Sequence, residues 1–219
     1  MKTKAAVSGS SILALVVVVI AIASIQLWLP DSVTVGPIWL IPLLEVTGIP
    51  IAMAIRRWDG SEGRVLRRTM NAYLMFLVLA CVMNAVLLLL SMLRGADESG
   101  QYLLLAGFGV LAINVMSFGL VYWWLDGGGP ERRAAGTVTR PDFLFPQQGM
   151  ATDQHWQPQL VDYLFTAYTN IIAFSPTDTM PLTPRVKGLF TLQSTTAVLT
   201  IVVTLSRAIN LIPDGVGPT

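Results

Sequence analysis

Long apolar runs, separated by short polar connections, occupy most of this sequence. A helix needs about 20 apolar residues to cross a hydrocarbon core of roughly 30 Å, and five runs reach or approach that length: residues 11–29, 37–55, 69–93, 103–125 and 186–206. A shorter apolar segment, residues 160–175, precedes the last run. The pattern predicts an all-α polytopic membrane helix bundle of about six spans, in which the fifth span is short and a proline-rich hairpin precedes the sixth.

The first apolar run follows Met1-Lys2-Thr3-Lys4, so a cleavable signal peptide has to be compared with a membrane anchor. The run from Ile12 to Leu29 is longer than the apolar region of a signal peptide. It also ends at Trp28 and Pro30, as expected for a span that reaches an interface. We therefore expect a retained anchor.

Basic residues are concentrated in alternate connections. They precede the first predicted span, follow the second and follow the fourth, whereas residues 31–36 and 94–101 carry acidic residues and a single Arg94. Basic residues accumulate on the cytoplasmic side, which predicts a multi-pass protein of a bacterial inner membrane with a cytoplasmic N-terminus. The orienting residues are Lys2, Lys4, Arg56, Arg57, Arg64, Arg67, Arg68, Arg132, Arg133 and Arg140.

The segment 160–175 either crosses the membrane or enters it and returns. A crossing places Arg185 and Lys187 outside and Arg207 inside, and a return exchanges these positions. The inside count then changes by only one of the 14 basic residues, so charge does not separate the two arrangements. We predict a crossing, because the segment is nearly long enough for a thin or tilted arrangement.

The composition excludes several classes of protein. Hydrophobic residues make up 53% of the 219 residues and charged residues 12%, with a mean hydropathy of +0.63, which lies outside the range of soluble domains. The net charge of +1 offers no electrostatic footprint for nucleic acid. A single Cys81 excludes an intramolecular disulfide, and a lone His155 cannot build a zinc site. No cofactor and no metal site are predicted.

Residues 126–158 form the longest segment without a predicted span. They divide the chain into a four-span bundle (1–125), a cytoplasmic Gly/Pro-rich linker (126–158) and a terminal unit (159–219) with a pore-loop-like hairpin and the last span. The three consecutive glycines at 127–129 do not form a phosphate loop, because no Lys-Ser/Thr follows them and no strand precedes them. We expect a flexible linker whose aromatic residues lie along the interface.

Glu45 lies between Pro42 and Pro50, near the middle of the second predicted span. An ionisable group inside a membrane is unfavourable and is a functional candidate by default. The prolines remove backbone N–H donors, so freed carbonyls could share a small polar site with the carboxyl. The alternative is a protonated or hydrogen-bonded structural carboxyl.

The last predicted span carries a polar stripe. Thr196, Thr200 and Thr204 repeat every four residues, which places them on one helix face, and Gln193 continues the stripe toward the start of the span. Such hydroxyls either line a hydrated path or connect helices and bond to their own backbone. Amides in the third and fourth predicted spans are expected to bond between helices, at Asn71, Asn84 and Asn114.

The short segment and the turn after it concentrate polar side chains between prolines. Asp178 is predicted to be a surface charge, a helix cap or one member of a carboxylate ring at the mouth of a symmetric oligomer. The predicted polar path comprises Thr169, Ser175, Thr177, Asp178, Gln193, Thr196, Thr200 and Thr204.

The hairpin resembles the pore loop and inner helix of tetrameric potassium channels over about 45 residues. The resemblance rests on Asp178-x-x-Pro181-Leu182-Thr183-Pro184, preceded by a helix containing Thr169 and followed by Gly188-Leu189-Phe190. Where that family has a Thr-Val-Gly-Tyr-Gly filter, this chain has Ile172-Ala173-Phe174-Ser175-Pro176-Thr177. The resemblance implies a pore-like geometry without a potassium filter.

Most of the chain is also similar to a family of small bacterial membrane proteins that share a domain of unknown function. In that family a Gly-rich linker precedes a short Tyr/Phe/Thr-rich span, a Phe-x-x-Ser-Asp turn and a terminal helix. The corresponding residues here are Asp162, Tyr163, Phe165 and Thr166, then Phe174 to Asp178 with Thr177 in place of the serine. This similarity implies a six-helix membrane fold and no established activity.

These patterns predict a homo-oligomer that forms a channel-like path for a small ion or solute. One alternative is a non-conducting membrane scaffold or accessory subunit, and another is a proton- or cation-linked carrier that uses Glu45. No enzyme is predicted, because the spans contain no histidine, no His-Glu-x-x-His and no paired carboxylates at a catalytic spacing. The expected partners are the lipid bilayer and further copies of the chain.

Overall fold

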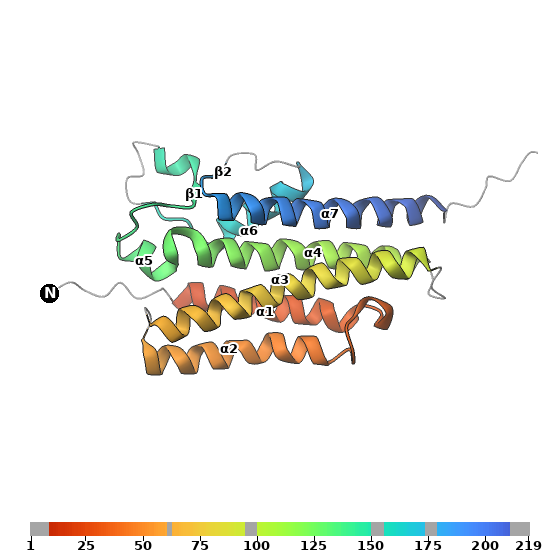
Figure 1. Cartoon of the computed structure of the whole chain (residues 1–219), viewed down its shortest axis with the longest axis horizontal. Coiled ribbons are helices and arrows are strands. Elements are labelled where there is room, and N and C mark those ends of the chain that lie inside the picture. The colour runs from red at the N-terminus through yellow and green to blue at the C-terminus, as the bar shows by residue number, and fades with distance from the viewer. Residues whose placement is uncertain (1–8, 61–62, 95–99, 150–155, 174–178, 211–219) are drawn as a thin grey trace, which may run out of the picture.

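The computed structural model describes residues 9–60, 63–94, 100–149, 156–173 and 179–210, and these residues are almost entirely helical. Five long helices lie side by side and two shorter ones pack at one end and one side (Figure 1). The helices are α1 (Gly9–Trp28), α2 (Leu40–Asp59), α3 (Arg64–Leu93), α4 (Gly100–Leu125), α5 (Pro130–Ala134), α6 (Leu160–Ile172) and α7 (Pro184–Asn210). The predicted all-α class is confirmed.

Helix α4 is the centre of the bundle, where it contacts α1, α3, α6 and α7. It is apolar on every side, as expected for a helix surrounded by other helices. Every residue from Ser117 to Trp124 is buried. Glycines bring the neighbouring helices close: a Cβ at Gly119 would lie 2.7 Å from Cδ2 of Leu164 on α6, and one at Gly107 would lie 2.3 Å from Oγ1 of Thr204 on α7.

The outer faces of the long helices are apolar. On α3, Met75, Leu79, Met83 and Val86 are 42–60% exposed at spacings of three and four residues, so they form one continuous apolar face. Exposed apolar surface of this extent indicates non-aqueous surroundings or a partner. Similar faces lie on α1, α2 and α7.

Among the residues that the structure describes, three helices are long and apolar enough to cross a membrane by length and composition: Arg64–Leu93, Leu104–Gly128 and Pro184–Ser206. The apolar stretch of α1, Leu13–Trp28, is shorter. Helix α2 does not reach this criterion in the described residues, and its last turn contains Arg56 and Arg57. The predicted count of six spans is therefore not confirmed.

The two helices of the terminal hairpin are held at one end of the bundle. Tyr163 in the first turn of α6 bonds to Asp126 at the end of α4, and Arg185 in the first turn of α7 bonds to Asp142 and to the carbonyl of Leu125. Both helices thus begin at the same end of the bundle (Figure 1). The predicted crossing of residues 160–175 is not confirmed: α6 has only 13 residues and packs alongside α7.

Much of the predicted flexible linker is part of the fold. Strand β1 (Phe143–Leu144) pairs antiparallel with β2 (Met180–Pro181). Phe143 is fully buried against Tyr122 and Tyr163, with ring centroids 5.4 and 5.6 Å apart. The glycine run ends α4 in a turn: Gly127, Gly128 and Gly129 have φ values of 56°, 84° and 113°, a region that favours glycine.

Candidate functional site

Glu45 lies in a buried polar network of three helices. Nε2 of Gln26 on α1 donates to Oε1 of Glu45 on α2 at 3.2 Å, and Nδ2 of Asn84 on α3 donates to Oε1 of Gln26 at 2.8 Å. The three side chains are 0–2% exposed. We call these residues the Glu45 network.

The second carboxylate oxygen of Glu45 is different from the first. Oε2 is buried and has no hydrogen-bond partner among the described residues. The side chains that bond to the Glu45 residue there, Gln26 and Tyr73, are both neutral. A carboxylate taken out of water requires a compensating positive charge or a proton. Oε2 can therefore accept a hydrogen bond from one more donor or bind a cation.

The backbone near Glu45 is held by α3. The hydroxyl of Tyr73 donates to the Glu45 carbonyl at 2.7 Å. Gly48, one turn further along α2, makes room for the Tyr73 ring, because a Cβ there would lie 2.1 Å from ring carbon Cε2. Glu45 itself lies in the second turn of α2, closer to one end of the helix than the predicted mid-span position.

A second polar network surrounds Gln193 of α7. Its Oε1 accepts from the Tyr122 hydroxyl at 2.7 Å and from Nδ2 of Asn170 at 2.8 Å, and its Nε2 donates to the carbonyl of Ala167 at 3.0 Å. Asn114 of α4 donates weakly to the Gln193 carbonyl at 3.5 Å. We call these residues the Gln193 network; they connect α4, α6 and α7.

Cys81 of α3 is fully buried. Oδ1 of Asn114 and Oγ of Ser117 are buried without a hydrogen-bond partner among the described residues. Buried polar atoms that lack a partner in the described part of the chain therefore lie on α4 as well as at Glu45 of α2.

The threonine stripe faces the inside of the protomer. Thr196, Thr200 and Thr204 are 3–6% exposed. The Thr196 hydroxyl donates to the Leu192 carbonyl at 2.8 Å and that of Thr200 to the Thr196 carbonyl at 2.9 Å, as threonines do when they bond to their own helix. Of the two uses predicted for the stripe, this geometry matches helix packing.

The predicted residues of the turn are placed only in part. Thr169 is buried and donates to the Thr166 carbonyl at 3.1 Å, inside α6. Ser175, Thr177 and Asp178 lie outside the described residues. The structure joins Gln193 to the hairpin helix but does not bring Glu45 into contact with the stripe.

Sequence reasoning missed a polar cluster at the end of the bundle where α4 ends. The cluster consists of Asp126, Arg133, Asp142, Tyr163 and Arg185, which we call the end cluster. Oδ1 of Asp126 accepts from the backbone of Asp142 and Phe143, and Oδ2 accepts from the Tyr163 hydroxyl at 2.5 Å. The Arg133 guanidinium lies over the Tyr163 ring at 5.2 Å and donates to two carbonyls of the turn.

Asp142 has a lowered pKa. Burial opposes its ionisation, but hydrogen bonds from Arg185 and Thr183, at 2.5 to 2.8 Å, outweigh burial and hold the pKa of Asp142 below its ordinary value. Asp142 pairs with Arg185, whereas Asp126 and Arg133 bond to backbone groups and contact Tyr163. The end cluster is therefore a clamp that joins the start of α6 and α7 to the end of α4.

The described residues form an all-α bundle in which three helices are long and apolar enough to cross a membrane. Among the described residues, no group of three or more His, Cys, Asp or Glu side chains is placed to hold a metal ion. Comparisons with protein-family models, with curated proteins and with solved structures give no match for this chain.

Proposed function

We propose that this chain is an integral membrane protein in which Glu45 binds a proton or a small monovalent cation, as the coupling site of a solute carrier. Membrane embedding is supported by the three long apolar helices and by the exposed apolar faces of α1, α2, α3 and α7. The coupling role is supported by the Glu45 network, in which an ionisable group is buried among neutral amides.

The observation that carries the proposal is the unpartnered Oε2 of the fully buried Glu45. A structural carboxyl is stabilised when both of its oxygens accept or donate hydrogen bonds. Here only Oε1 has a partner among the described residues. Proton or cation binding at Oε2 supplies the missing contact and neutralises the charge, and release of either changes the charge inside the bundle.

The surroundings of Glu45 suit a site that changes state. Pro50 lies inside α2 and removes one N–H donor from the hydrogen bonds of that helix, whereas Pro42 lies in the first turn, where N–H groups have no partner within the helix. Oxygen atoms of carboxylate, amide and backbone carbonyl groups are the ligands of small hard cations in broken membrane helices. The Glu45 network contains carboxylate and amide oxygens.

The test compares wild type, Glu45→Gln and the control Asp31→Asn in liposomes. Asp31 is exposed and lies in the connection between α1 and α2, so its variant changes one carboxyl outside the network. A pH-sensitive dye inside the liposomes reports proton movement under imposed sodium and potassium gradients, and infrared difference spectra between acid and alkaline pH report carboxyl protonation. We expect Glu45→Gln to lose the proton flux and one titrating carboxyl band. Unchanged flux and spectra in this variant would contradict the proposal.

A second function, a non-conducting scaffold or accessory subunit, is favoured by the burial of the threonine stripe. The hydroxyls bond within α7 and pack on α4, so they connect helices inside one protomer. Under this function Thr200→Val lowers the stability of the protein without affecting flux. A loss of flux in a Thr200→Val protein of normal stability would argue against it.

The hypothesis of a channel-like path depends in part on residues that lie outside the described residues. Asp178 at the proposed mouth is one of them, and the stripe does not line an open path in the single protomer. Homo-oligomerisation remains a prediction, and native mass spectrometry of the detergent-purified protein tests it by counting protomers. A closed ring would place several hairpins around one axis, whereas a monomer would remove the shared pore.

A further inference from the structure

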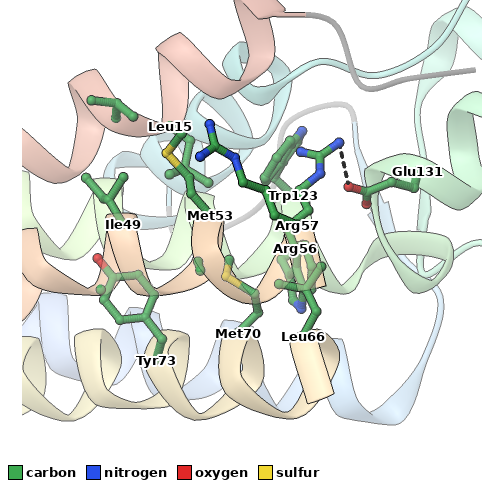
Figure 2. A pocket seen from close by; sticks show the side chains of 14 residues that line it. Leu15, Ile49, Met53, Arg56, Arg57, Leu66, Met70, Tyr73, Trp123 and Glu131 are labelled. Atoms are coloured by element: carbon green, nitrogen blue, oxygen red, sulfur yellow. Dashed lines mark ion pairs between the residues drawn. The ribbon is translucent and has the colours of Figure 1, made fainter. Parts of the chain in front are cut away.

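A pocket of about 370 Å³ lies between α1, α2, α3 and α4, and none of the side chains of the Glu45 network or the Gln193 network lines it. This volume falls within the range of about 300 to 1,000 Å³ that is typical of small-molecule sites. Figure 2 shows Leu15, Ile49, Met53 and Met70 around it, with Tyr73 at one end and two arginines at the other. Most of its wall is apolar: Leu15, Val16, Ile49, Ala52, Met53, Leu66, Met70 and the rings of Trp123 and Trp124.

The mouth of the pocket is charged. Nη2 of Arg56 lies 3.7 Å from Oε1 of Glu131, and the two arginine side chains lie on the same side of the pocket as Glu131 (Figure 2). Arg57 is exposed and makes no side-chain hydrogen bond or ion pair within the part of the chain that the structure describes. Positive charge therefore exceeds negative charge at this mouth.

The position of the pocket matches a lipid headgroup region. It lies at the end of the bundle that carries the end cluster and the basic residues of the connection after α2. Met53 is 45% exposed and Arg57 is exposed, so this part of the lining reaches the outer surface of the bundle. An arginine at the headgroup level beside an apolar groove is the arrangement that binds anionic lipids between helices.

We propose that this pocket binds an anionic glycerophospholipid, with the phosphate at Arg57 and Arg56 and an acyl chain along the apolar wall. The inference rests on the proposed membrane embedding and is independent of proton or cation binding at Glu45. A free phosphate ion leaves the apolar wall empty, and in a zwitterionic lipid the ammonium of the headgroup offsets the phosphate charge that would pair with Arg57. The lipid phosphate competes with Glu131 for Arg56, and Arg57 supplies the unopposed charge.

The experiment is native mass spectrometry of the intact protein in a neutral detergent, with added phosphatidylglycerol or with phosphatidylcholine of the same acyl chains. Wild type, Arg57→Gln and the control Arg68→Gln are compared, because Arg68 is an exposed arginine of the next helix that does not line the pocket. Removal of one positive charge at a membrane surface weakens binding of anionic lipid by about fivefold. We expect that decrease for phosphatidylglycerol with Arg57→Gln and little change with Arg68→Gln.

A second variant, Ala52→Leu, fills the pocket without changing its charge. We expect it also to reduce phosphatidylglycerol binding, and its thermal unfolding without lipid shows whether the fold is retained. Equal decreases for Arg57→Gln and Arg68→Gln would show that only the general surface charge attracts lipid, and would overturn the site. Equal binding of phosphatidylcholine, or protection against thermal unfolding by inorganic phosphate alone to the same extent, would overturn the anionic lipid as its occupant.

Discussion

Arg185 donates two hydrogen bonds to the carboxylate of Asp142, from Nε to Oδ1 at 2.8 Å and from Nη2 to Oδ2 at 2.5 Å, although 43 residues separate them. Such bidentate pairs are stronger and more directional than single hydrogen bonds. Thr183 adds a third bond to Oδ1 at 2.6 Å. Together with the bond from Arg185 to the Leu125 carbonyl, these contacts hold the start of α7 beside the end of α4.

The first prediction concerns the charge of Asp142. Its pKa is lower in the folded protein than the ordinary value of 3.8, so the ionised carboxylate stabilises the fold at every pH above that value. This contribution is lost as the pH falls below the ordinary value and through the folded pKa. We expect Asp142→Asn to lower the free energy of unfolding by about 1 to 3 kcal/mol at neutral pH and to show less further loss on acidification than wild type.

Thermal unfolding in detergent, measured at several values of pH, tests this prediction. Asp31→Asn is the control, because it makes the same chemical change at an exposed position at the opposite end of the bundle. If wild type and Asp142→Asn are equally stable at neutral pH, the carboxylate does not stabilise the end of the bundle in the way described.

The second prediction concerns which side of the membrane the hairpin faces. Strand β2 and the turn after α5 lie at the same end of the bundle, whereas the connection between α1 and α2 lies at the other. Cysteines at Met180 and Thr137, both exposed, should therefore react with a membrane-impermeant thiol reagent from the same side. A cysteine at Val35, also exposed, should react from the opposite side.

Cys81 is the single cysteine of the sequence, and it is buried. The labelling uses a Cys81→Ala background, so that each introduced cysteine is the only thiol in its variant. Right-side-out and inverted vesicles distinguish the sides. Labelling of Met180→Cys and Thr137→Cys from opposite sides would restore the crossing that the sequence predicted.

The extent of the helices could be predicted closely from the sequence, because hydrophobic runs report local structure. The predicted runs 69–93, 103–125 and 186–206 lie within the helices Arg64–Leu93, Gly100–Leu125 and Pro184–Asn210. The common starting end of α6 and α7 could not be predicted, because a 13-residue helix is ambiguous in length and the charge count hardly changes. The end cluster was also missed: its bonds join residues as far as 43 positions apart, and no local pattern marks such pairs.

The sequence identified individual polar residues of the candidate site but did not predict which of them bond to one another. Glu45 and Gln193 stand out in the sequence as polar groups within apolar runs. The sequence does not reveal that Gln26 bonds to Glu45, because an amide near the end of a predicted span is common at an interface. The sequence likewise does not indicate whether the face of α7 that carries the threonine stripe is buried, since that depends on the position of α4.

The third prediction concerns Gln193, whose side chain makes hydrogen bonds with three groups. Gln193→Leu removes the acceptor of Tyr122 and Asn170 and the donor to Ala167. Buried polar groups that lose their partners destabilise a fold, and side-chain bonds between membrane helices contribute less than those in water. We expect a loss of about 2 to 4 kcal/mol in the free energy of unfolding. Denaturation in mixed micelles measures it.

The matched control for Gln193→Leu is Thr191→Val. Thr191 is exposed on the same helix and bonds only to the Lys187 carbonyl of its own turn in the described residues. This substitution also replaces a polar group by an apolar one, and we expect a change within about 0.5 kcal/mol. Similar losses in the two variants would mean that Gln193 is not a hub of the bundle.

The fourth prediction separates two glycines that look alike in the sequence. A Cβ at Gly119 of α4 would lie 2.7 Å from Cδ2 and 3.1 Å from Cα of Leu164 on α6, whereas a Cβ at Gly188 of α7 would have no atom within 4 Å. Gly119→Ala therefore forces α4 and α6 apart, and overpacking of this kind lowers the free energy of unfolding by about 1 to 3 kcal/mol. Gly188→Ala gains helix propensity instead and should stabilise by up to about 1 kcal/mol.

Both variants make the same chemical change within a helix, so the difference between them measures the close approach of α4 and α6. Thermal unfolding of both in one detergent gives that difference. The double variant Gly119→Ala with Leu164→Ala removes the 2.7 Å contact but leaves the 3.1 Å contact to the backbone. It should therefore recover only part of the stability that is lost by Gly119→Ala relative to Leu164→Ala alone. If Gly119→Ala and Gly188→Ala unfold at the same temperature, α6 does not pack on α4 as closely as the structure shows, and the hairpin that the end cluster holds would be free to move away from the bundle.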